Sequence, residues 1–494
     1  MNLNQFIQHW AKQTPRATAI VYGKESISFA QLAERSALAA FVLKNEYRVE
    51  PGDRVSYLGL NHPDVLSILL ACERIGAIFN PLNSRLAAAE YTYLLGNAEP
   101  TVFLVDRHFE ELVSNLDEAQ DIAVSLDNVF ASTAFDDVEY QPGNGETALL
   151  LVYTSGTTGR PKGVVLSQKA VLANIENCQN LYNFQPGQNV QITLPLFHVG
   201  GLCILLLPAL THGATIHLHQ RFDPIATLED IEQNHITTSI FVPAQMAAMM
   251  GSPRWQSSDL SSMKYAVVGS SVIPLQQIKN FHMRGIPVSQ LYGATETGPA
   301  AIGLPIDDAL KKEGSAGTVV KNCAIEIRDQ KRNKLADGKH GDVWVQGPNI
   351  LSHYWRDEEE TAKVLIEGWY NTGDIGFVDP DGFYWIIDRS KDVVISGGEN
   401  IYPAEIELAS LEHPAISAVA VVGQKHDRWG ETPVAVVEIN SGCHLDLEEY
   451  QDFLKDKLAK FKHPKTLMIV EQLPRNGMGK IEKSVLRRQV NRSS

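Results

Sequence analysis

Apolar positions in the first 300 residues form short continuous runs that alternate with longer, helically spaced segments. The sequence FAQLAERSALAAFVLKN, residues 29–45, places apolar side chains on one helical face, and Ser28 with Gln31 forms a capping box before it. Because the strand-like runs are separated by helical segments, the pattern predicts crossover connections and mainly parallel sheets. The runs are residues 54–58, 101–105, 148–153, 191–194, 215–218, 238–242 and 265–268.

The pattern changes twice in the C-terminal part of the chain. After about residue 315 it predicts a smaller β-rich subdomain, with short strands at 325–328, 342–345 and 383–387. From residue 389 it predicts a third unit, with strands at 417–422 and 434–439 and an amphipathic helix near 447–460. The charged pair Asp388-Arg389, followed by Ser390-Lys391-Asp392, marks the expected boundary. The predicted division is therefore 1–388 and 389–494, in an α/β protein whose smaller domain is α+β.

Composition narrows the class of protein. A chain of 494 residues with 44% hydrophobic residues can bury more than one core. Its net charge of −15 argues against nucleic acid as the main partner. The longest apolar stretch, residues 202–210, is about half of a membrane span and contains a proline. Five widely spaced cysteines and the lack of a secretory signal lead us to expect a soluble, cytoplasmic protein.

The most informative motif is TSGTTGRPKG, residues 154–163, which follows the apolar run 148–153. Glycines allow backbone N–H groups to turn toward an anion, hydroxyls add donors, and lysine adds charge. It is not a Walker A loop, because Pro161 precedes the lysine and Gly163 follows it. A solvated Gly/Thr turn is the alternative. The candidate phosphate-binding residues are Thr154, Ser155, Gly156, Thr157, Thr158, Gly159 and Lys162.

With four further motifs in order, this loop resembles the adenylate-forming acyl-CoA synthetases, a family that includes luciferases and peptide-synthetase adenylation domains. The resemblance covers essentially the whole chain. It implies ATP, Mg²⁺ and coenzyme A as the small molecules bound, together with a carboxylic acid. The other motifs are LYGATETG (291–298), WYNTGD (369–374), DRSKDVVISGGENIYPAEIE (388–407) and PRNGMGKI (474–481).

The resemblance assigns roles within the nucleotide site. It gives Tyr292 to adenine stacking, Thr295 to the α-phosphate and Glu296 to Mg²⁺, which prefers few carboxylates beside phosphate oxygens. A solvated turn carboxylate is the alternative for Glu296. Gly293 and Ala294 belong to the same motif. Residues Gly269, Ser270 and Ser271 match the family's adenine-contact segment.

The resemblance implies two half-reactions, in the first of which the carboxylic acid and ATP form acyl-AMP. Three more residues are candidates for this step. Asp374 suits the two ribose hydroxyls, and Arg389 suits ribose and phosphate together. A turn cap or a surface ion pair is the alternative for both. Joining a carboxylate to a phosphate brings two anions together, and the resemblance gives the bridging cation to Lys480. A surface lysine in a basic tail is its alternative.

In the second half-reaction CoA displaces AMP from acyl-AMP. The resemblance implies that this step needs a moving lid, residues 389–494, with its hinge at Lys391. After the lid has turned, Gly397 and Gly398 are expected to face the adenylate and to line the entrance for the pantetheine arm of CoA. A homodimer is among the assemblies that the sequence allows.

The histidines give weaker indications of function than these motifs do. His198, in PLFHVGGL, is either a general base or gate of the acid site, or a buried histidine with satisfied hydrogen bonds. His217 and His219 share a strand face, but no acidic or cysteine partner is spaced with them, so we do not predict a zinc site.

The predicted activity is acyl-CoA synthesis through acyl-AMP, with an aryl (hydroxycinnamate-like) or medium- to long-chain fatty acid as substrate. The alternative is a stand-alone adenylation enzyme that loads a carrier protein. An amino-acid adenylation domain is disfavoured, because PLFHVGG offers no carboxylate for a substrate ammonium. A luciferase-type oxygenase remains open. A non-catalytic protein of this fold is disfavoured by the presence of both Lys480 and Glu296.

Overall fold

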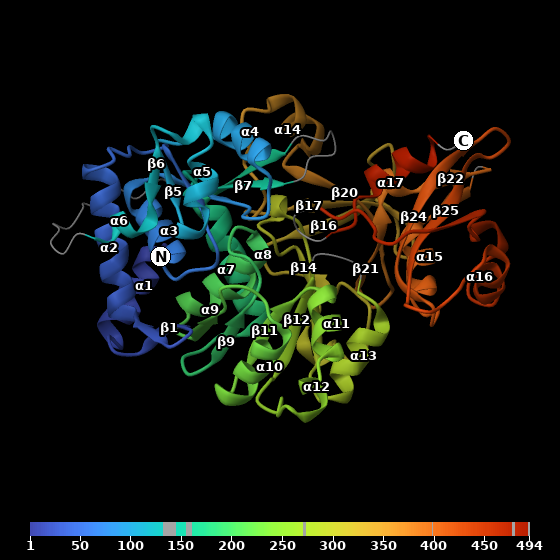
Figure 1. The fold of residues 1–494 in the computed structure, drawn as a ribbon, viewed down its shortest axis with the longest axis horizontal. Coiled ribbons are helices and arrows are strands. Elements are labelled where there is room, and N and C mark those ends of the chain that lie inside the picture. Colours follow the sequence, from blue (N-terminus) through green and yellow to red (C-terminus); the bar gives the residue numbers. More distant parts are fainter. Residues whose placement is uncertain (132–144, 155–160, 270–272, 398, 477–479, 493–494) are drawn as a thin grey trace. The chain divides into compact units, whose positions relative to one another are not determined.

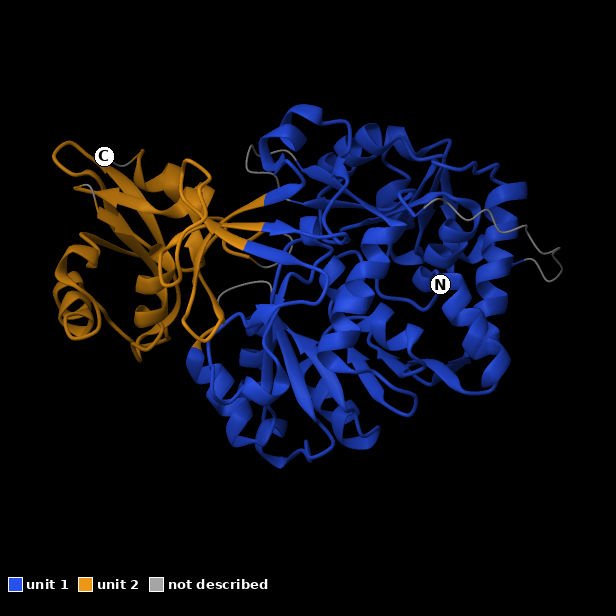
Figure 2. Cartoon of the chain, turned by 180° about the vertical axis from the view of Figure 1, so that it is seen from behind, with its two compact units in different colours: residues 1–270, 275–325, 345–370 blue, residues 271–274, 326–344, 371–494 orange. Residues whose placement is uncertain are grey.

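The computed structural model describes residues 1–131, 145–154, 161–269, 273–397, 399–476 and 480–492. The chain divides into two compact units, which Figure 2 shows in two colours. Unit 1 consists of residues 1–270, 275–325 and 345–370, and unit 2 of residues 271–274, 326–344 and 371–494. The border between the units falls inside strands β16, β17 and β20.

The larger sheet of unit 1 has nine strands in the described part of the chain. Its central strands pair in parallel, and antiparallel pairs appear where β2, β14 and β15 join. In spatial order the strands are β15 (Thr318–Val319), β14 (Ile302–Gly303), β13 (Val288–Tyr292), β12 (Tyr265–Gly269), β11 (Thr238–Phe241), β9 (Asn189–Ile192), β10 (Thr215–Leu218), β1 (Thr18–Tyr22) and β2 (Glu25–Ser28).

A second sheet of unit 1 has seven described strands. Parallel pairs join β7, β4, β3, β5 and β6, whereas β8 pairs antiparallel with both β7 and β18. The order is β18 (His353–Tyr354), β8 (Lys162–Ser167), β7 (Ala148–Thr154), β4 (Ile78–Leu82), β3 (Arg54–Leu58), β5 (Val102–Val105) and β6 (Ala123–Ser125). Strand β5 and most of β7 read as continuous apolar runs because the parallel part of the sheet is buried.

Helices cover both sheets of unit 1. The N-terminal helices α1, α2 and α3 pack against one another and lie side by side in Figure 1. The stretch 202–206 is a π-helical turn that is buried in the core. The helices are α1 (Leu3–Gln13), α2 (Phe29–Asn45), α3 (Asp64–Ile75), α4 (Ala88–Ala98), α5 (Glu110–Val113), α6 (Leu126–Val129), α7 (Gln168–Tyr182), α8 (Val199–Gly201), α9 (Leu207–Thr211), α10 (Pro224–Gln233), α11 (Pro243–Gly251), α12 (Arg254–Ser257), α13 (Leu275–Met283) and α14 (Glu358–Val364).

The remaining strands form two smaller sheets. The first contains β16 (Ala324–Arg328), β17 (Gly341–Gln346), β20 (Trp369–Val378), β19 (Leu365–Ile366) and, beside β20, β21 (Tyr384–Arg389). The second, within unit 2, contains β23 (Glu399–Ile401), β22 (Val394–Ser396), β25 (Gly430–Ile439), β24 (Ile416–His426) and, beside β25, β26 (Thr466–Ile469). Helices α15 (Pro403–Ser410), α16 (Leu447–Leu454) and α17 (Lys483–Val490) accompany it.

The predicted fold class is confirmed, and most local elements lie within one or two residues of their expected limits. Helix α2 spans the predicted residues, and its capping box is present because Gln31 N donates to Ser28 Oγ and Ser28 N to Gln31 Oε1. The helix expected near 447–460 ends at Leu454. Strands β24 and β25 are longer than predicted because they form one hairpin. None of the helices in the described ranges is long and apolar enough to cross a membrane.

Candidate active site

The TSGTTGRPKG motif connects two antiparallel strands of the seven-stranded sheet. Thr154 is the last residue of β7, and Lys162, the first residue of β8, is its partner across the pair. The loop therefore leaves and re-enters the sheet at the same level, which holds its two ends close together. The predicted residues Ser155, Gly156, Thr157, Thr158 and Gly159 lie outside the described residues.

Lys162 is held by two neighbours from the C-terminal end of unit 1. Its ammonium forms an ion pair with Glu360 of α14, and it lies 5.3 Å from the centroid of the Tyr354 ring. The hydrogen bond from Lys162, followed by that from Lys363, holds the pKa of Glu360 below its usual value. Lys162 therefore presents its charge from a fixed position at the exit of the loop.

Glu296 lies in the 3₁₀ turn Thr295–Thr297, which follows β13. The hydroxyl of Tyr354 donates to Glu296 Oε1 over 2.9 Å. Tyr354 thus contacts both the predicted metal ligand and the lysine of the phosphate loop. A single oriented carboxylate is a ligand that suits Mg²⁺ bound to a nucleotide, because this ion takes few carboxylates beside phosphate oxygens. Within the described residues there is no cluster of three or more metal-binding side chains.

The ends of β12 and β13 bring two other predicted segments together. Gly269, the last residue of β12, is opposite Leu291 in β13. A side chain at Gly269 would place its Cβ 2.7 Å from the carbonyl oxygen of Leu291, so only glycine fits. Tyr292 is the last residue of β13. Parallel strands present their carboxyl ends at one edge, which is where α/β proteins bind ligands. Ser270 and Ser271 lie outside the described residues.

The turn after Tyr292 is fixed by close backbone approach. A Cβ at Gly293 would lie 1.7 Å from the carbonyl oxygen of Pro299, and Ala294 N donates to Thr297 Oγ1 over 2.9 Å. Thr295 is buried, with 5% of its surface exposed. These contacts fix the backbone on which Glu296 stands.

Asp374 and Arg389, which lie 15 positions apart in the sequence, are brought together in unit 2. They are directly opposite each other in the β20–β21 pair, and Arg389 Nε lies 2.7 Å from Asp374 Oδ1. Asp374 is buried, whereas about half of the Arg389 side chain is exposed. The predicted carboxylate–guanidinium constellation therefore exists as one contact. Its ribose and phosphate roles stay predictions.

The predicted hinge lies in a short 3₁₀ turn, Ser390–Asp392, whose neighbours are tied into unit 2. Asp388 accepts from Ala404 N and Arg389 N, each over 2.7 Å, and Asp392 pairs with Arg487 of α17 over 2.9 Å. Burial lowers the pKa of Lys391. The hinge position is therefore flanked by anchored residues on both sides.

Two predicted lid residues have distinct surroundings. Gly397 has φ +61°, and a Cβ there would lie 2.9 Å from the ring of Trp429, whose carbonyl oxygen accepts from Gly397 N over 2.8 Å. Gly398 lies outside the described residues. Lys480 is exposed, and its backbone pairs with Asn476 through N–H to Oδ1 at 3.0 Å and carbonyl oxygen to N at 2.9 Å.

The three histidines singled out in the sequence each contact a neighbouring polar group. His198 precedes α8 and its Nδ1 accepts from Gly200 N over 3.0 Å, so this nitrogen is engaged in capping. The sequence spacing gave no acidic partner for His217 and His219, but Asp230 of α10 is one: it lies 3.3 Å from His217 Nδ1 and 2.8 Å from His219 Nε2. Burial opposes ionisation, yet the two histidines and Gln191 hold the pKa of Asp230 well below its usual range.

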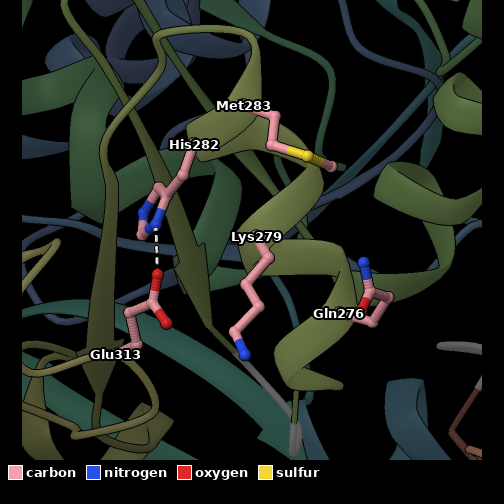
Figure 3. A pocket seen from close by; sticks show the side chains of 5 residues that line it. All are labelled: Gln276, Lys279, His282, Met283 and Glu313. Atoms are coloured by element: carbon pink, nitrogen blue, oxygen red, sulfur yellow. Dashed lines mark hydrogen bonds and ion pairs between the residues drawn. The ribbon is translucent and has the colours of Figure 1, made fainter.

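A surface depression of about 490 Å³ is lined by residues of α13 and by Glu313, none of which is a predicted site residue. Figure 3 shows His282 and Glu313 pointing toward each other there, with His282 Nδ1 2.7 Å from Glu313 Oε1. His282 Nε2 accepts from Val288 N over 3.1 Å, so the proton is on Nδ1. The pair fixes α13 to its neighbours and supplies no reactive group.

Four side chains at these sites went unnoticed in the sequence. Tyr354 stands in a strand of two residues, too short for a periodic pattern, and Glu360 lies in a run of four acidic residues, DEEE, that indicates only a solvated helix start. Asp230 belongs to an amphipathic helix, and Trp429 to a hairpin end. Each makes its contacts through the tertiary fold, and for Tyr354 with Glu296 and Glu360 with Lys162 these span 58 and 198 positions, for which local sequence gives no signal.

Comparison with known proteins agrees with this geometry. The family models "AMP-binding enzyme" and "AMP-binding enzyme C-terminal domain" match residues 7–355 and 405–480. The chain is 41% identical to an indoleacetate–CoA ligase of Aromatoleum aromaticum, covering 100% of this chain and 99% of the relative. It is 37% identical to a feruloyl-CoA synthase of an Amycolatopsis species, covering 98% of this chain and 99% of the relative.

Solved structures give the same result. The o-succinylbenzoate CoA synthetase from Bacillus subtilis, in complex with its acyl-adenylate intermediate, superposes with a TM-score of 0.89 at 30% identity, over 98% of this chain and 97% of that one. A structure of the same enzyme contains ATP and a magnesium ion. Enzymes of this kind use ATP, Mg²⁺ and coenzyme A. The chain therefore belongs to the AMP-binding enzyme family and is an AMP-forming carboxylate–CoA ligase.

Proposed function

We propose that this ligase activates an aromatic carboxylic acid in two half-reactions. The acid's carboxylate oxygen attacks the α-phosphorus of ATP, so that the bond to the β-phosphate oxygen breaks and pyrophosphate leaves. The thiolate of CoA then attacks the acyl carbon, the bond to the AMP oxygen breaks, and AMP leaves. The pairing of Asp374 with Arg389, and of Glu296 with Tyr354 beside Lys162, supports this chemistry most directly.

Each predicted residue has a proposed part in the first step. Lys162 and the hydroxyls of the loop bind the β- and γ-phosphates, Thr295 donates to the α-phosphate, and Glu296 holds Mg²⁺. The ion, when bound, neutralises the charge that develops on the leaving pyrophosphate. Tyr292 stacks on adenine beside Gly269, and Asp374 with Arg389 binds ribose. Lys480 bridges the carboxylate and the α-phosphate, whose mutual repulsion otherwise opposes the attack.

For the second step we propose that the lid, residues 389–494, turns about Lys391. Lys480 then leaves the adenylate, and the segment with Gly397 and Gly398 takes its place. Gly397 already has the left-handed conformation that allows a tight hairpin end. A homodimer and a cytoplasmic location are compatible with this proposal.

The acid is proposed from the substrates of the two relatives. Indoleacetate and ferulate are both acids with a planar aromatic ring, and the two relatives cover the chain almost completely. The glycines Gly200, Gly201 and Gly293 do not by themselves open space for a ring, because neighbouring protein atoms already lie beside them. An added Cβ would lie 2.9 Å from His198 Nδ1, 2.3 Å from the Pro195 carbonyl oxygen and 1.7 Å from the Pro299 carbonyl oxygen, respectively.

Pyrophosphate release with a panel of acids tests this proposal. We expect aryl acids such as indoleacetate, ferulate and coumarate to give the highest kcat/KM, well above octanoate. In an enzyme with a fatty-acid tunnel, kcat/KM would instead rise steadily with chain length, because each buried CH₂ adds about 0.8 kcal/mol of binding free energy. Such a rise would contradict the proposal of an aromatic acid and favour a fatty acid. Activity confined to acetate or an amino acid would contradict both of these substrate classes. Transfer to a carrier protein but not to CoA would favour a loading enzyme.

A further inference from the structure

The segment 351–355 connects the two elements that carry the predicted metal ligand and the phosphate-loop lysine. On one side, Leu351 N donates to the carbonyl oxygen of Glu296 over 2.8 Å. On the other side, Tyr354 is opposite Val164 of β8, and Trp355 N donates to the carbonyl oxygen of Gly163 over 2.7 Å. The segment thus fixes the distance between the turn of Glu296 and the first residues of β8.

Tyr354 projects from this segment and is buried, with 5% of its surface exposed. Its hydroxyl donates to Glu296 Oε1 over 2.9 Å. A buried donor bonded to one carboxylate oxygen fixes the plane of the carboxylate and so the direction of its second oxygen.

The ring of Tyr354 has a second contact. The Lys162 ammonium lies 5.3 Å from the ring centroid, within the range of a cation–π interaction, and pairs with Glu360. Thr361, the next residue of α14, accepts from Tyr354 N over 2.9 Å. One side chain therefore contacts a cation suited to phosphates and an anion suited to a metal ion.

We propose that Tyr354 is a positioning residue of the MgATP site: its hydroxyl orients Glu296 toward Mg²⁺, and its ring places the Lys162 ammonium for the phosphates. The inference rests on the proposed function, which assigns Glu296 and Lys162 to MgATP. Tyr354 itself touches neither reacting atom; it acts through these two side chains.

The test separates the hydroxyl from the ring. Tyr354→Phe keeps the ring and removes the donor, and Tyr354→Leu removes both. Binding of ATP is measured by calorimetry without acid or CoA, once over a Mg²⁺ series and once in EDTA. For Tyr354→Phe we expect the Mg²⁺ concentration at half-saturation to rise about tenfold, as for the loss of a hydrogen bond to a charged group, while the Kd for ATP in EDTA changes less than about twofold. For Tyr354→Leu we expect the Kd in EDTA to rise by about threefold to fivefold as well.

Tyr91→Phe is the matched control. Tyr91 is also fully buried in unit 1, and its hydroxyl donates to a backbone oxygen, that of Asn83, over 2.7 Å. It loses the same atom without touching Glu296, so its Mg²⁺ dependence should equal that of the wild type. Conversion of synthetic acyl-AMP and CoA to thioester, a step without MgATP, should be unchanged in Tyr354→Phe.

Two results would overturn the inference. One is an unchanged Mg²⁺ series in Tyr354→Phe, and the other is an equal shift in Tyr354→Phe and Tyr91→Phe, which would indicate a general loss of packing. A double variant sharpens the result: in a Glu296→Gln background, Tyr354→Phe should add less than about twofold, because its target is already gone. If the wild-type protein does not bind MgATP at all, the proposed function fails; if it does and Tyr354→Phe equals it, only the positioning role fails.

Discussion

Lys162 and Glu296 of unit 1 lie on either side of one tyrosine, whereas unit 2 gathers its charges around Lys483. There the Lys483 ammonium lies 2.8 Å from Glu407, near Asp388 and Asp392, and Arg487 joins Asp392. The unit 1 cluster uses one hydroxyl, one ring and one ion pair. The unit 2 cluster is a network of buried ions at the predicted hinge.

The two clusters differ in how their charged side chains are held. In unit 1 the contacts of Tyr354 orient the Lys162 and Glu296 side chains. In unit 2 burial lowers the pKa of Lys483 by itself, but Glu407 and Asp388 outweigh it and hold this pKa above its usual value. Burial in turn raises the pKa of Glu407 and Asp388. Such buried networks cost desolvation energy and specify one geometry, here that of the residues next to the hinge.

The largest expected effect concerns Lys480, the cation that unit 2 is proposed to supply to chemistry in unit 1. Lys480→Ala should lower acyl-AMP formation by about 10²–10³-fold, the typical effect of one well-placed electrostatic donor. Conversion of synthetic acyl-AMP with CoA should persist. Pyrophosphate release and thioester formation measure the two steps, and Lys455→Ala, an exposed lysine of the same unit, is the control. Equal loss in both steps would contradict the division of labour.

Next is the hinge itself. Lys391→Pro fixes φ near −65° and removes a backbone donor, so the lid should be held in one pose. We expect nearly normal acyl-AMP formation and about a 10²-fold loss of CoA transfer, as for a misplaced reacting group. Lys391→Ala, which removes the side chain and leaves the backbone free, should transfer CoA far better. Unaffected thioester turnover in Lys391→Pro would show that rotation at this point is not needed.

The buried network offers a stability test. Lys483→Met leaves Glu407 buried without its cation and should destabilise unit 2 by about 3–5 kcal/mol. Replacing both partners, with Glu407→Gln and Lys483→Met together, should restore part of the loss, because no unpaired charge remains. Urea unfolding of the variants measures this. If the double variant is as unstable as the sum of the single ones, the two groups are not coupled.

The smallest expected effect is on alkaline stability. Because the pKa of Lys483 is raised in the folded state, its contribution is complete below the unfolded value of about 10.5 and is lost as the pH rises through the folded value. The melting temperature should therefore fall above pH 10.5. The fall should be smaller in the Glu407→Gln/Lys483→Met variant, which has no such group. Identical pH profiles would show that the network does not titrate with unfolding.

Much of this fold could be predicted from the sequence. The runs that became β5 and most of β7 are apolar because these strands are buried in the sheet, and helix α2 carries its own capping box. The hairpin register that joins Asp374 to Arg389 was not visible, although both residues were singled out. The ends of longer elements were also missed: α16 stops at Leu454, because tertiary contacts rather than periodicity decide where a helix ends.

The sequence by itself determined the family and singled out the residues that we propose to bind phosphates, a metal ion and ribose, because these choices depend on side-chain chemistry at fixed spacings in loops. Only the tertiary structure decided which side chains orient them. Tyr354 reaches Glu296 across 58 positions, and Asp230 of helix α10 reaches His217 of β10 and the nearby His219. Such contacts arise when distant segments are packed into one sheet or one core, and a local pattern of apolar and polar residues carries no record of the partner across that distance.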